Sequence, residues 1–517
     1  MKKNMFKKIL KKIKNFYNIK TINGYRKAKR EKKLKELEVI RDELTGLELN
    51  ISNKKLELSL RQFLLRYLVS FRFNIAIFHA INDDRPIIYP LPKEWILLLR
   101  KKGFRVNFLL SSILLYILSI FFFLKSFKTF FNYLIYFNDN FPKSEYVYFH
   151  NIPEYCLPID NENSYDVFSW YNKKYIKEKL IKPDIFVKFN FKKNEYTKNF
   201  KIKYSKYPYP SLTSFNKLIF IINYFLLFFK IVINIFLFNY KKIILTDERV
   251  HEIYVKRLEK KNLAYEYLFN IGDFIYRPLW TYEIENFSKI TLYNYSGSFL
   301  GHKRLGTYPP DEVGLKSINW PNILQWSEKY NIFLEERVNQ KLNLKLVSPI
   351  WLHDKKIYLN LKNNKKTISV FDVPPSSILR KCELNANLYR TTNCSKKFLN
   401  DIVKFSKEFN IDIYFKNKRK LDNRYTSKSY QIFLEKLVSQ DLINFIDPIT
   451  SPFRLIEETD MNISIPFTST SLVGKYLNKP SCFYDPMIIL DKQDRATQGV
   501  DLLKGEEELK NWFKDNA

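Results

Sequence analysis

The stretch that decides the fold is Asn-Ile-Ser-Ile-Pro-Phe-Thr-Ser-Thr-Ser-Leu-Val-Gly, residues 462–474, followed by Lys-Pro-Ser-Cys-Phe-Tyr-Asp-Pro, residues 479–486. Its hydrophobic pattern predicts a buried strand over Ile463–Ile465, a turn rich in hydroxyl side chains, a helix with one apolar face, and a second strand that ends at Asp485. A strand, a helix and a strand in this order indicate one α/β crossover unit with parallel strands.

The turn of this unit contains four consecutive hydroxyl residues, Thr468, Ser469, Thr470 and Ser471. At the carboxyl end of a strand, where the next helix begins, hydroxyl groups and free backbone N–H groups attract phosphate. A helix needs only one such residue as its N-cap, and that structural role is the alternative. Since four residues exceed what a cap needs, we interpret them as a phosphate-binding turn.

The same segment resembles the bacterial surface-carbohydrate biosynthesis proteins that are known for a Pro-Phe-Thr-Ser motif. Pro466–Ser469 match the motif, and the Lys-Pro-Ser and Tyr-Asp-Pro residues, the charged turn Asp491–Arg495 and Gly499-Val500 follow the family pattern as well. The resemblance implies a cytoplasmic glycosyltransferase-like protein with two Rossmann-like lobes, the GT-B arrangement. Its C-terminal lobe would bind a nucleotide-activated sugar.

Composition sets the broad class of the protein. The 517-residue chain is long enough for two or three domains. Its formal net charge of +34 favours an anionic partner such as a membrane surface, a nucleic acid or a nucleotide. An AT-rich genome would also favour Lys, Asn, Ile, Phe and Tyr over Gly. The four cysteines show no metal-site spacing and the start has no signal-peptide layout, so we expect reduced thiols in a cytoplasmic protein.

We divide the chain into three parts. Residues 1–70 are a basic helical segment that opens with a predicted amphipathic helix over Met1–Phe16. Residues 71–360 are an N-terminal acceptor lobe, and Ile87–Phe104 fit its first strand and helix. Residues 361–517 alternate strands and helices, which predicts a doubly wound parallel sheet that binds the nucleotide-sugar. The predicted fold class is therefore α/β, with two Rossmann-like lobes, a helical basic N-terminal segment and two long membrane-associated helices.

Those two helices correspond to the hydrophobic segments 107–124 and 218–238, each about long enough to cross a bilayer. Two transmembrane helices would export the lysine-rich segment between them, against the positive-inside tendency. The resemblance also assigns Val147–Ile159 to the same lobe as Ile87–Phe104, and one lobe cannot fold on both sides of a membrane. We therefore favour helices that dip into the cytoplasmic leaflet and return, with buried core helices as the third option.

A basic loop follows the predicted strand Ile411–Phe415. At the edge that faces the hydroxyl turn, its cations would neutralise the phosphates of a nucleotide, whereas the alternative is a solvated surface loop. Asp485 could accept a hydrogen bond from a ribose hydroxyl or merely form a turn with Pro486. The basic residues in question are Lys416, Lys418, Arg419 and Arg424.

Sugar transfer needs a general base, and one carboxylate must lie near the acceptor hydroxyl. We take Glu283, in the family-like stretch Arg277–Glu285, and Asp372, at the end of a predicted strand, as candidate catalytic residues. The five histidines form no metal-binding motif and Asp-x-Asp does not occur, so we expect neither a metal nor a cofactor. Dinucleotide, kinase and hydrolase motifs do not occur in the sequence either.

The leading interpretation is a membrane-associated glycosyltransferase of capsule, O-antigen or similar polysaccharide biosynthesis, at the cytoplasmic face of the inner membrane. Its partners would be a nucleotide-sugar donor, a lipid-linked glycan acceptor and the inner leaflet, and no motif points to nucleic acid. The turn is similar to the hydroxyl phosphate site of sialyl- and Kdo-transferases, which suggests a CMP-activated donor, although their Asp-Gly and His-Pro motifs are absent here. The alternatives are a two-lobed nucleotide-sugar epimerase and a non-catalytic basic membrane scaffold.

Overall fold

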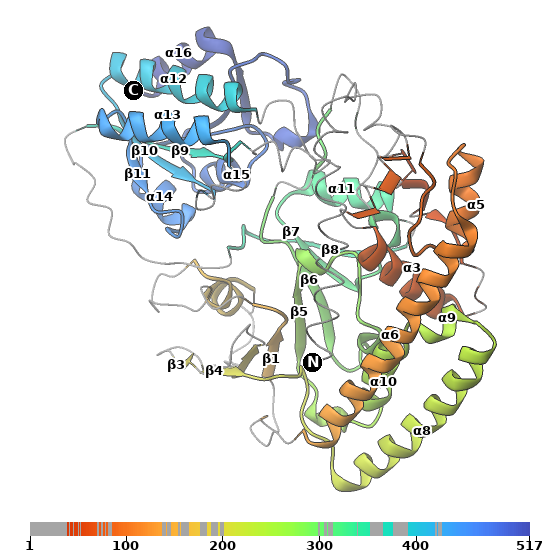
Figure 1. The fold of residues 1–517 in the computed structure, drawn as a ribbon. Helices are drawn as coiled ribbons and strands as arrows, with labels where there is room; N and C mark the ends of the chain where they lie inside the picture. The colour runs from red at the N-terminus through yellow and green to blue at the C-terminus, as the bar shows by residue number, and fades with distance from the viewer. Residues whose placement is uncertain are drawn as a thin grey trace.

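Two parallel β-sheets organise the chain in the computed structural model (Figure 1). The structure describes residues 39–375 and 391–517, apart from gaps at 41, 45, 50, 52, 70–71, 74–75, 78, 81–84, 137–140, 142–145, 153–155, 157–164, 176–183, 188–194, 197–200, 298–299, 304–307, 309–313, 339, 352–364, 419–420 and 422–425. The predicted amphipathic helix over Met1–Phe16 lies outside the described residues.

The C-terminal lobe (C-lobe) is a six-stranded sheet in the order β11-β10-β9-β12-β13-β14, and every pair of neighbours is parallel. Numbered along the chain, this is the Rossmann order 3-2-1-4-5-6, with its switch point between β9 and β12. The strands are β9 (Thr367–Asp372), β10 (Asp412–Asn417), β11 (Asn444–Ile446), β12 (Met461–Ser464), β13 (Ser481–Asp485) and β14 (Asp501–Lys504). The helices are α12 (Thr392–Glu408), α13 (Lys428–Ser439), α14 (Pro452–Glu458), α15 (Ser469–Tyr476) and α16 (Gly505–Asn516).

The predicted crossover unit is β12, α15 and β13, and its strands pair in parallel. Close packing of the helix on the strands requires a glycine at position 474. A Cβ atom there would lie 2.0 Å from Ser481 Oγ and 2.7 Å from Asn462 Nδ2. The hydroxyl turn between β12 and α15 therefore follows the switch-point strand of the C-lobe directly.

The N-terminal lobe (N-lobe) is an eight-stranded sheet in the order β3-β4-β2-β1-β5-β6-β7-β8, parallel except for the β3–β4 pair. Its switch point lies between β1 and β5. The strands are β1 (Tyr146–Phe149), β2 (Asp184–Val187), β3 (Glu195–Tyr196), β4 (Lys201–Tyr204), β5 (Glu266–Asn270), β6 (Lys289–Tyr293), β7 (Asn322–Gln325) and β8 (Asn343–Leu346). Helices α7 (Val167–Trp170), α10 (Thr246–Val255) and α11 (Glu328–Arg337) belong to this lobe. Two Rossmann-like lobes confirm the predicted fold class.

One prediction about the N-lobe is wrong. Ile87 makes only an isolated parallel bridge to Val106, and neither residue belongs to the eight-stranded sheet. The segment packs instead in a separate hydrophobic cluster formed by α3 (Lys54–Leu68), α5 (Lys93–Lys101) and one face of the first long apolar helix. The first strand of the sheet is β1, inside the segment that the family resemblance had assigned to this lobe.

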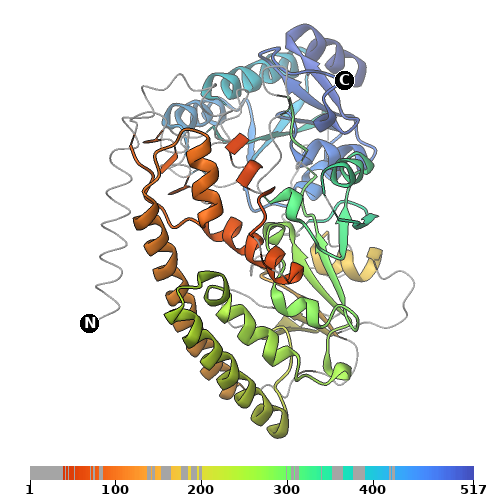
Figure 2. The same ribbon diagram turned by 90° about the vertical axis from the view of Figure 1, so that its right-hand side faces the viewer.

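The two hydrophobic segments form long helices, α6 (Phe108–Leu134) and α8 (Ser214–Phe236), which lie side by side in Figures 1 and 2. The two helices are antiparallel, because residues near the start of α6 contact the end of α8, and residues near the end of α6 contact the first half of α8. The Tyr116 hydroxyl donates to Ile235 O (2.6 Å), and Phe130 stacks on Tyr224. We call this pair the apolar hairpin. Both helices are long and apolar enough to cross a membrane, and 28% and 22% of their most apolar windows are buried.

Candidate functional site

The carboxyl ends of strands from both lobes meet at the hydroxyl turn. Ser469 follows β12, and its Oγ lies 2.7 Å from Oγ of Ser296, in the loop after β6. The backbone N–H of Gly297 also donates to Ser469 Oγ (3.1 Å). Ligands of open α/β sheets bind beyond the carboxyl ends of the strands at a switch point. The turn after β12 therefore lies where a ligand of the C-lobe is expected and where the N-lobe touches the C-lobe.

The four predicted phosphate-binding hydroxyls have different surroundings. Ser471 is fully buried, donates to Cys482 O (2.8 Å) and contacts Ser464 Oγ (2.5 Å), so its hydroxyl holds the crossover unit together. The Thr468 hydroxyl bonds to Ser464 Oγ and Ile465 O and closes the turn. Thr470, which is half-buried, has its hydroxyl 3.2 Å from that of Thr468. These hydroxyls are engaged within the protein, which leaves the N–H groups at the start of α15 as the turn's groups for an anion.

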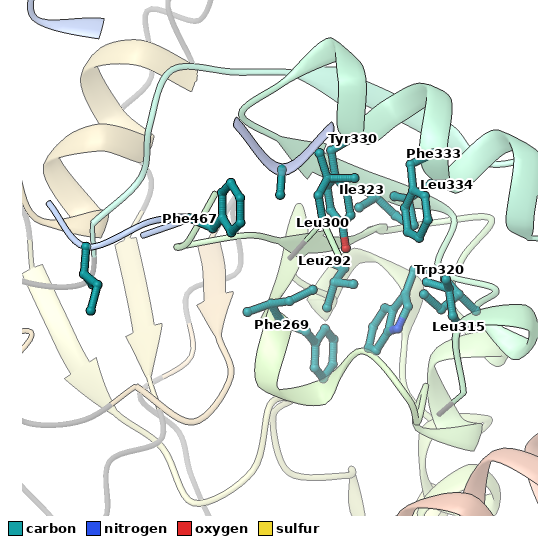
Figure 3. Packing of buried hydrophobic residues seen from close by; sticks show 14 of the residues in the cluster. Phe269, Leu292, Leu300, Leu315, Trp320, Ile323, Tyr330, Phe333, Leu334 and Phe467 are labelled. Carbon is teal, nitrogen blue, oxygen red and sulfur yellow. The ribbon is translucent and has the colours of Figure 1, made fainter. Parts of the chain in front are cut away.

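Phe467 of the motif has a backbone conformation that is unusual for a bulky residue. Its φ of 60° lies in the left-handed region, which costs a residue with a side chain roughly 1–2 kcal/mol. The conformation turns the ring to the N-lobe, where it lies 5.1 Å from the His302 ring and joins the cluster that contains Leu300 (Figure 3). The energy cost of the turn is therefore offset by burial against the other lobe.

Lys416 is a buried cation one strand away from the switch point. The register aligns it with Phe371 on β9, and Phe371 with Ser464 on β12, so all three lie in one row on one face of the sheet. Only 4% of Lys416 is exposed, and no salt bridge joins it to a carboxylate among the described residues. Burial lowers its pKa to about 8, opposed by the charge of Asp447. The Nζ of Lys416 donates to Asn417 O (3.4 Å), and its contact with an anion stays a prediction.

The other predicted cations divide into two groups. Lys418 is exposed directly after β10, and its backbone N–H donates to Asp372 O (3.1 Å). Arg419 and Arg424 lie outside the described residues. Their predicted contact with a nucleotide stays a prediction.

Asp485 forms the turn that the sequence offered as its alternative role. One carboxylate oxygen accepts from the backbone N–H of Met487 (3.1 Å) and the other from that of Leu490 (2.8 Å), and the side chain is fully buried. Both oxygens therefore stabilise the loop after β13. A bond to a ribose hydroxyl would have to use their remaining lone pairs.

The two candidate bases lie in different lobes. Asp372 ends β9 at the C-lobe switch point, is buried, and accepts a short hydrogen bond from the Tyr430 hydroxyl. Glu283 lies in the N-lobe between Lys55 (2.6 Å) and Lys256 (3.5 Å). Burial works to raise the pKa of Glu283, but the hydrogen bond and charge of Lys55 outweigh it and hold that pKa below its usual value. A carboxylate that two lysines bind is a weak base, so these contacts favour a structural ion pair.

A histidine occupies the N-lobe switch point. His150 directly follows β1, is half-buried, and its backbone N–H donates to Leu268 O of β5 (2.8 Å). Its ring lies 4.8 Å from that of Phe269. His150 is not among the site residues that the sequence predicts. The position of His150 directly after the apolar run Tyr-Val-Tyr-Phe, residues 146–149, would have identified it as a residue at a strand end. Among the described residues, no group of three or more His, Cys, Asp or Glu could hold a metal ion.

Two parallel sheets in Rossmann order, joined at the carboxyl ends of their strands, define a two-lobed α/β protein of the GT-B class. The chain belongs to the family of polysaccharide biosynthesis PFTS motif proteins, because the family model matches residues 226–513, more than half of the chain. The family resemblance inferred from the sequence is thus confirmed. No curated protein matches the chain.

Several solved structures are similar in arrangement. A mutant of S. aureus TarM in complex with fondaparinux, alpha-GlcNAc-glycerol and UDP aligns over 52% of this chain and 51% of its own length, with a TM-score of 0.30 and 10% identity. The UDP-GlcNAc 2-epimerase of Methanocaldococcus jannaschii aligns over 71% and 92%, with a TM-score of 0.37 and 10% identity. That of Neisseria meningitidis, bound to UDP-GlcNAc, aligns over 71% and 90%, with a TM-score of 0.37 and 9% identity. These scores are low, so the fold assignment rests on the sheet topology.

Proposed function

We propose that this protein is a glycosyltransferase that transfers a sugar from a nucleotide donor to a lipid-linked acceptor in capsule or O-antigen biosynthesis, at the cytoplasmic face of the inner membrane. The observation that carries the proposal is the C-lobe switch point between β9 and β12, which the family's own motif borders. Proteins with the Rossmann strand order bind nucleotides at this switch point, which supports a nucleotide here, and the polysaccharide family supports an activated sugar as the substrate.

The donor diphosphate would lie between the start of α15 and Lys416. Backbone N–H groups at a helix N-terminus and a buried cation are the groups that bind phosphate without a metal. Lys416 lies beside β11, and Ile446, its register partner there, directly precedes the loop of Thr450 and Ser451. Those two hydroxyls are buried, and neither has a hydrogen-bond partner among the described residues. A CMP-activated sugar stays the predicted donor.

The acceptor hydroxyl would be activated from the N-lobe. Among the candidate bases, Glu283 is held by two lysines, and Asp372 accepts a hydrogen bond from Tyr430. His150 is at the switch point of the lobe that would hold the acceptor, and an imidazole is a suitable base near neutral pH. We therefore assign the base to His150 in this proposal.

The apolar hairpin supports attachment to one leaflet. One stripe of α6, from Ser111 to Tyr133, is buried along the helix, and α10 binds that stripe through Asp247, which accepts from Thr129 Oγ1 (2.6 Å). A helix that packs on its own lobe along one whole stripe is better suited to lie on one leaflet than to cross the bilayer. The segment between α6 and α8 also contributes β1, which pairs with β5 beyond α8.

The opposite stripe of the hairpin is apolar and exposed. Leu109 keeps 67% of its surface exposed, Phe215 72% and Phe236 77%. Neither helix contains an acidic residue, and the exposed Lys128 and Lys230 suit anionic headgroups. A lipid-linked acceptor would reach the enzyme along this exposed apolar surface.

A thermal-shift screen of nucleotides and nucleotide-sugars tests the donor site. A ligand at 100 times its dissociation constant should add about 2.7 kcal/mol of stability. The shift should disappear in Lys416→Met and persist in the exposed control Lys436→Met. If no nucleotide shifts the wild type, or if both variants respond like it, the proposed donor site is wrong.

A further inference from the structure

The Pro-Phe-Thr-Ser turn makes more contacts with the other lobe than a helix cap or a phosphate loop requires. The Phe467 ring lies 5.1 Å from the His302 ring of the N-lobe and 5.8 Å from the Phe483 ring of its own lobe. Ser469 binds both the hydroxyl of Ser296 and the N–H of Gly297. The Thr468 hydroxyl makes two bonds to the end of β12, which fix the turn that presents the other two side chains.

The N-lobe loop after β6 packs closely against α15 at Gly297. A Cβ atom on Gly297 would lie 2.6 Å from Leu472 Cδ1 of α15 and 3.0 Å from Trp326 Cε3 of the N-lobe. A side chain at position 297 would therefore require the Leu472 side chain to move. The Trp326 indole N–H donates to Asn294 O (2.7 Å), and this bond holds the Trp326 ring in place beside Gly297.

A second band of contacts joins the same two regions. Gln498 Nε2 donates to Gly297 O (2.5 Å), and Arg495 Nε donates to Gly301 O (2.9 Å). Lys303 donates from its backbone N–H to Asp494 (2.6 Å) and from Nζ to Asp491 (2.6 Å). The hydrogen bond from Lys303 also holds the pKa of Asp491 below its usual value.

These bonds satisfy polar groups of one lobe with groups of the other. Ser296, Gly297, Gly301 and Lys303 all follow β6, whereas their partners follow β12 or β13. Ser469 and Asp494 are buried, so the loss of their partners would carry a desolvation cost and their bonds favour the docked arrangement over a separated one. The partly exposed Lys303–Asp491 ion pair contributes little.

We propose that the motif turn is an interlobe docking element, in which Phe467 and Ser469 bind the loop after β6 and so fix the N-lobe relative to the C-lobe switch point. This assignment goes beyond the proposed transferase activity and does not depend on it. The docking role accounts for the contacts of the Ser469 hydroxyl with Ser296 and Gly297. A phosphate that takes the Ser469 hydroxyl must displace Ser296, so an anion at that hydroxyl would compete with lobe docking.

Cysteine cross-linking in the full-length chain tests the contact. The 2.7 Å between the two hydroxyl oxygens suits a disulfide between Ser296→Cys and Ser469→Cys. Oxidation should cross-link this pair, and proteolysis between the lobes should then leave two fragments joined until reductant is added. The matched pair Ser296→Cys with Thr470→Cys should remain uncross-linked. The described native cysteines, Cys156, Cys394 and Cys482, are buried. Absence of the Ser296–Ser469 cross-link, or equal cross-linking of both pairs, would overturn the proposal.

Hydrogen exchange separates docking from simple stabilisation of the C-lobe. Ser469→Ala removes the acceptor of the Gly297 N–H, so exchange of that amide should quicken by about tenfold, the factor that one hydrogen bond represents. Small-angle scattering should show a larger radius of gyration at the same time. In the control Ser471→Ala, whose lost bonds lie within the C-lobe, the melting temperature should fall while both readouts stay at the wild-type value. If Ser469→Ala behaves like Ser471→Ala, the turn is only a structural cap.

Discussion

Two glutamates on the outer face of α8 should detach the protein from membranes without unfolding it. Leu226 and Phe229 keep 56% and 60% of their surfaces exposed, so neither contributes much to the core. Burying a whole Leu or Phe side chain contributes about 1.5–3 kcal/mol, and the exposed fractions correspond to about 1–2 kcal/mol each. Leu226→Glu with Phe229→Glu should therefore weaken binding to a leaflet by about 100-fold or more, before the cost of the charges is added.

Flotation with anionic phospholipid vesicles measures this effect directly. Glutamate is a good helix former, so the melting temperature should stay close to that of the wild type. The control variant Ile432→Glu changes a residue of α13 that is equally exposed, at 56%, and it should float with vesicles as the wild type does. High salt should release little of the wild type, since apolar contact is not screened. Equal flotation of the double variant and the wild type, or complete release of the wild type by salt, would refute the hairpin as the membrane contact.

Three further predictions concern the lobes. Nucleotide affinity, measured by calorimetry, should fall as pH rises through about 8, where Lys416 loses its charge, and the affinity of Lys416→Met should be lower and flat with pH. Because the folded pKa of this lysine lies below its unfolded value, the wild type should also gain stability between pH 8 and 10.5, as urea unfolding would show. Gly474→Ala should lower stability by about 1–3 kcal/mol in thermal unfolding, because the added Cβ meets Ser481. His150→Ala should abolish sugar transfer while Glu283→Gln retains it, and the reverse result would return the base to Glu283.

The C-lobe could be predicted closely because its strands are short apolar runs and its helices are bounded by turn residues. The predicted strand Ile411–Phe415 corresponds to β10, and the strand, helix and strand predicted around the motif correspond to β12, α15 and β13. The N-lobe was harder, since its strands are dispersed among long apolar helices. The residues around Ile87 have the composition of a strand, but Ile87 forms only a single bridge, to Val106. No local sequence pattern distinguishes such an isolated bridge from a strand at the edge of a sheet.

The candidate site was predicted in position but not in contacts. Sequence periodicity places the hydroxyl turn after a strand, yet it cannot show that Ser471 bonds to Cys482 or that Ser469 faces Ser296, 173 positions earlier. Such partners depend on how the two lobes dock. Burial of Lys416 is likewise a tertiary property, because the same basic loop would be solvated if β10 were an edge strand.

The pairing of β1 with β5 has a consequence for biosynthesis of the chain. Val147 of β1 pairs with Glu266 of β5, so the ribosome must add 119 residues after Val147 before these two strands can pair. Helix α6 leaves the ribosome before β1, and α8 leaves it during that interval, so both helices of the apolar hairpin are made before the sheet that supports them exists. Pairing between strands so distant in sequence is slow, and the hairpin's apolar surface is exposed meanwhile. Translation beside a membrane would give that surface its partner early, and a chain made away from lipid should depend on chaperones.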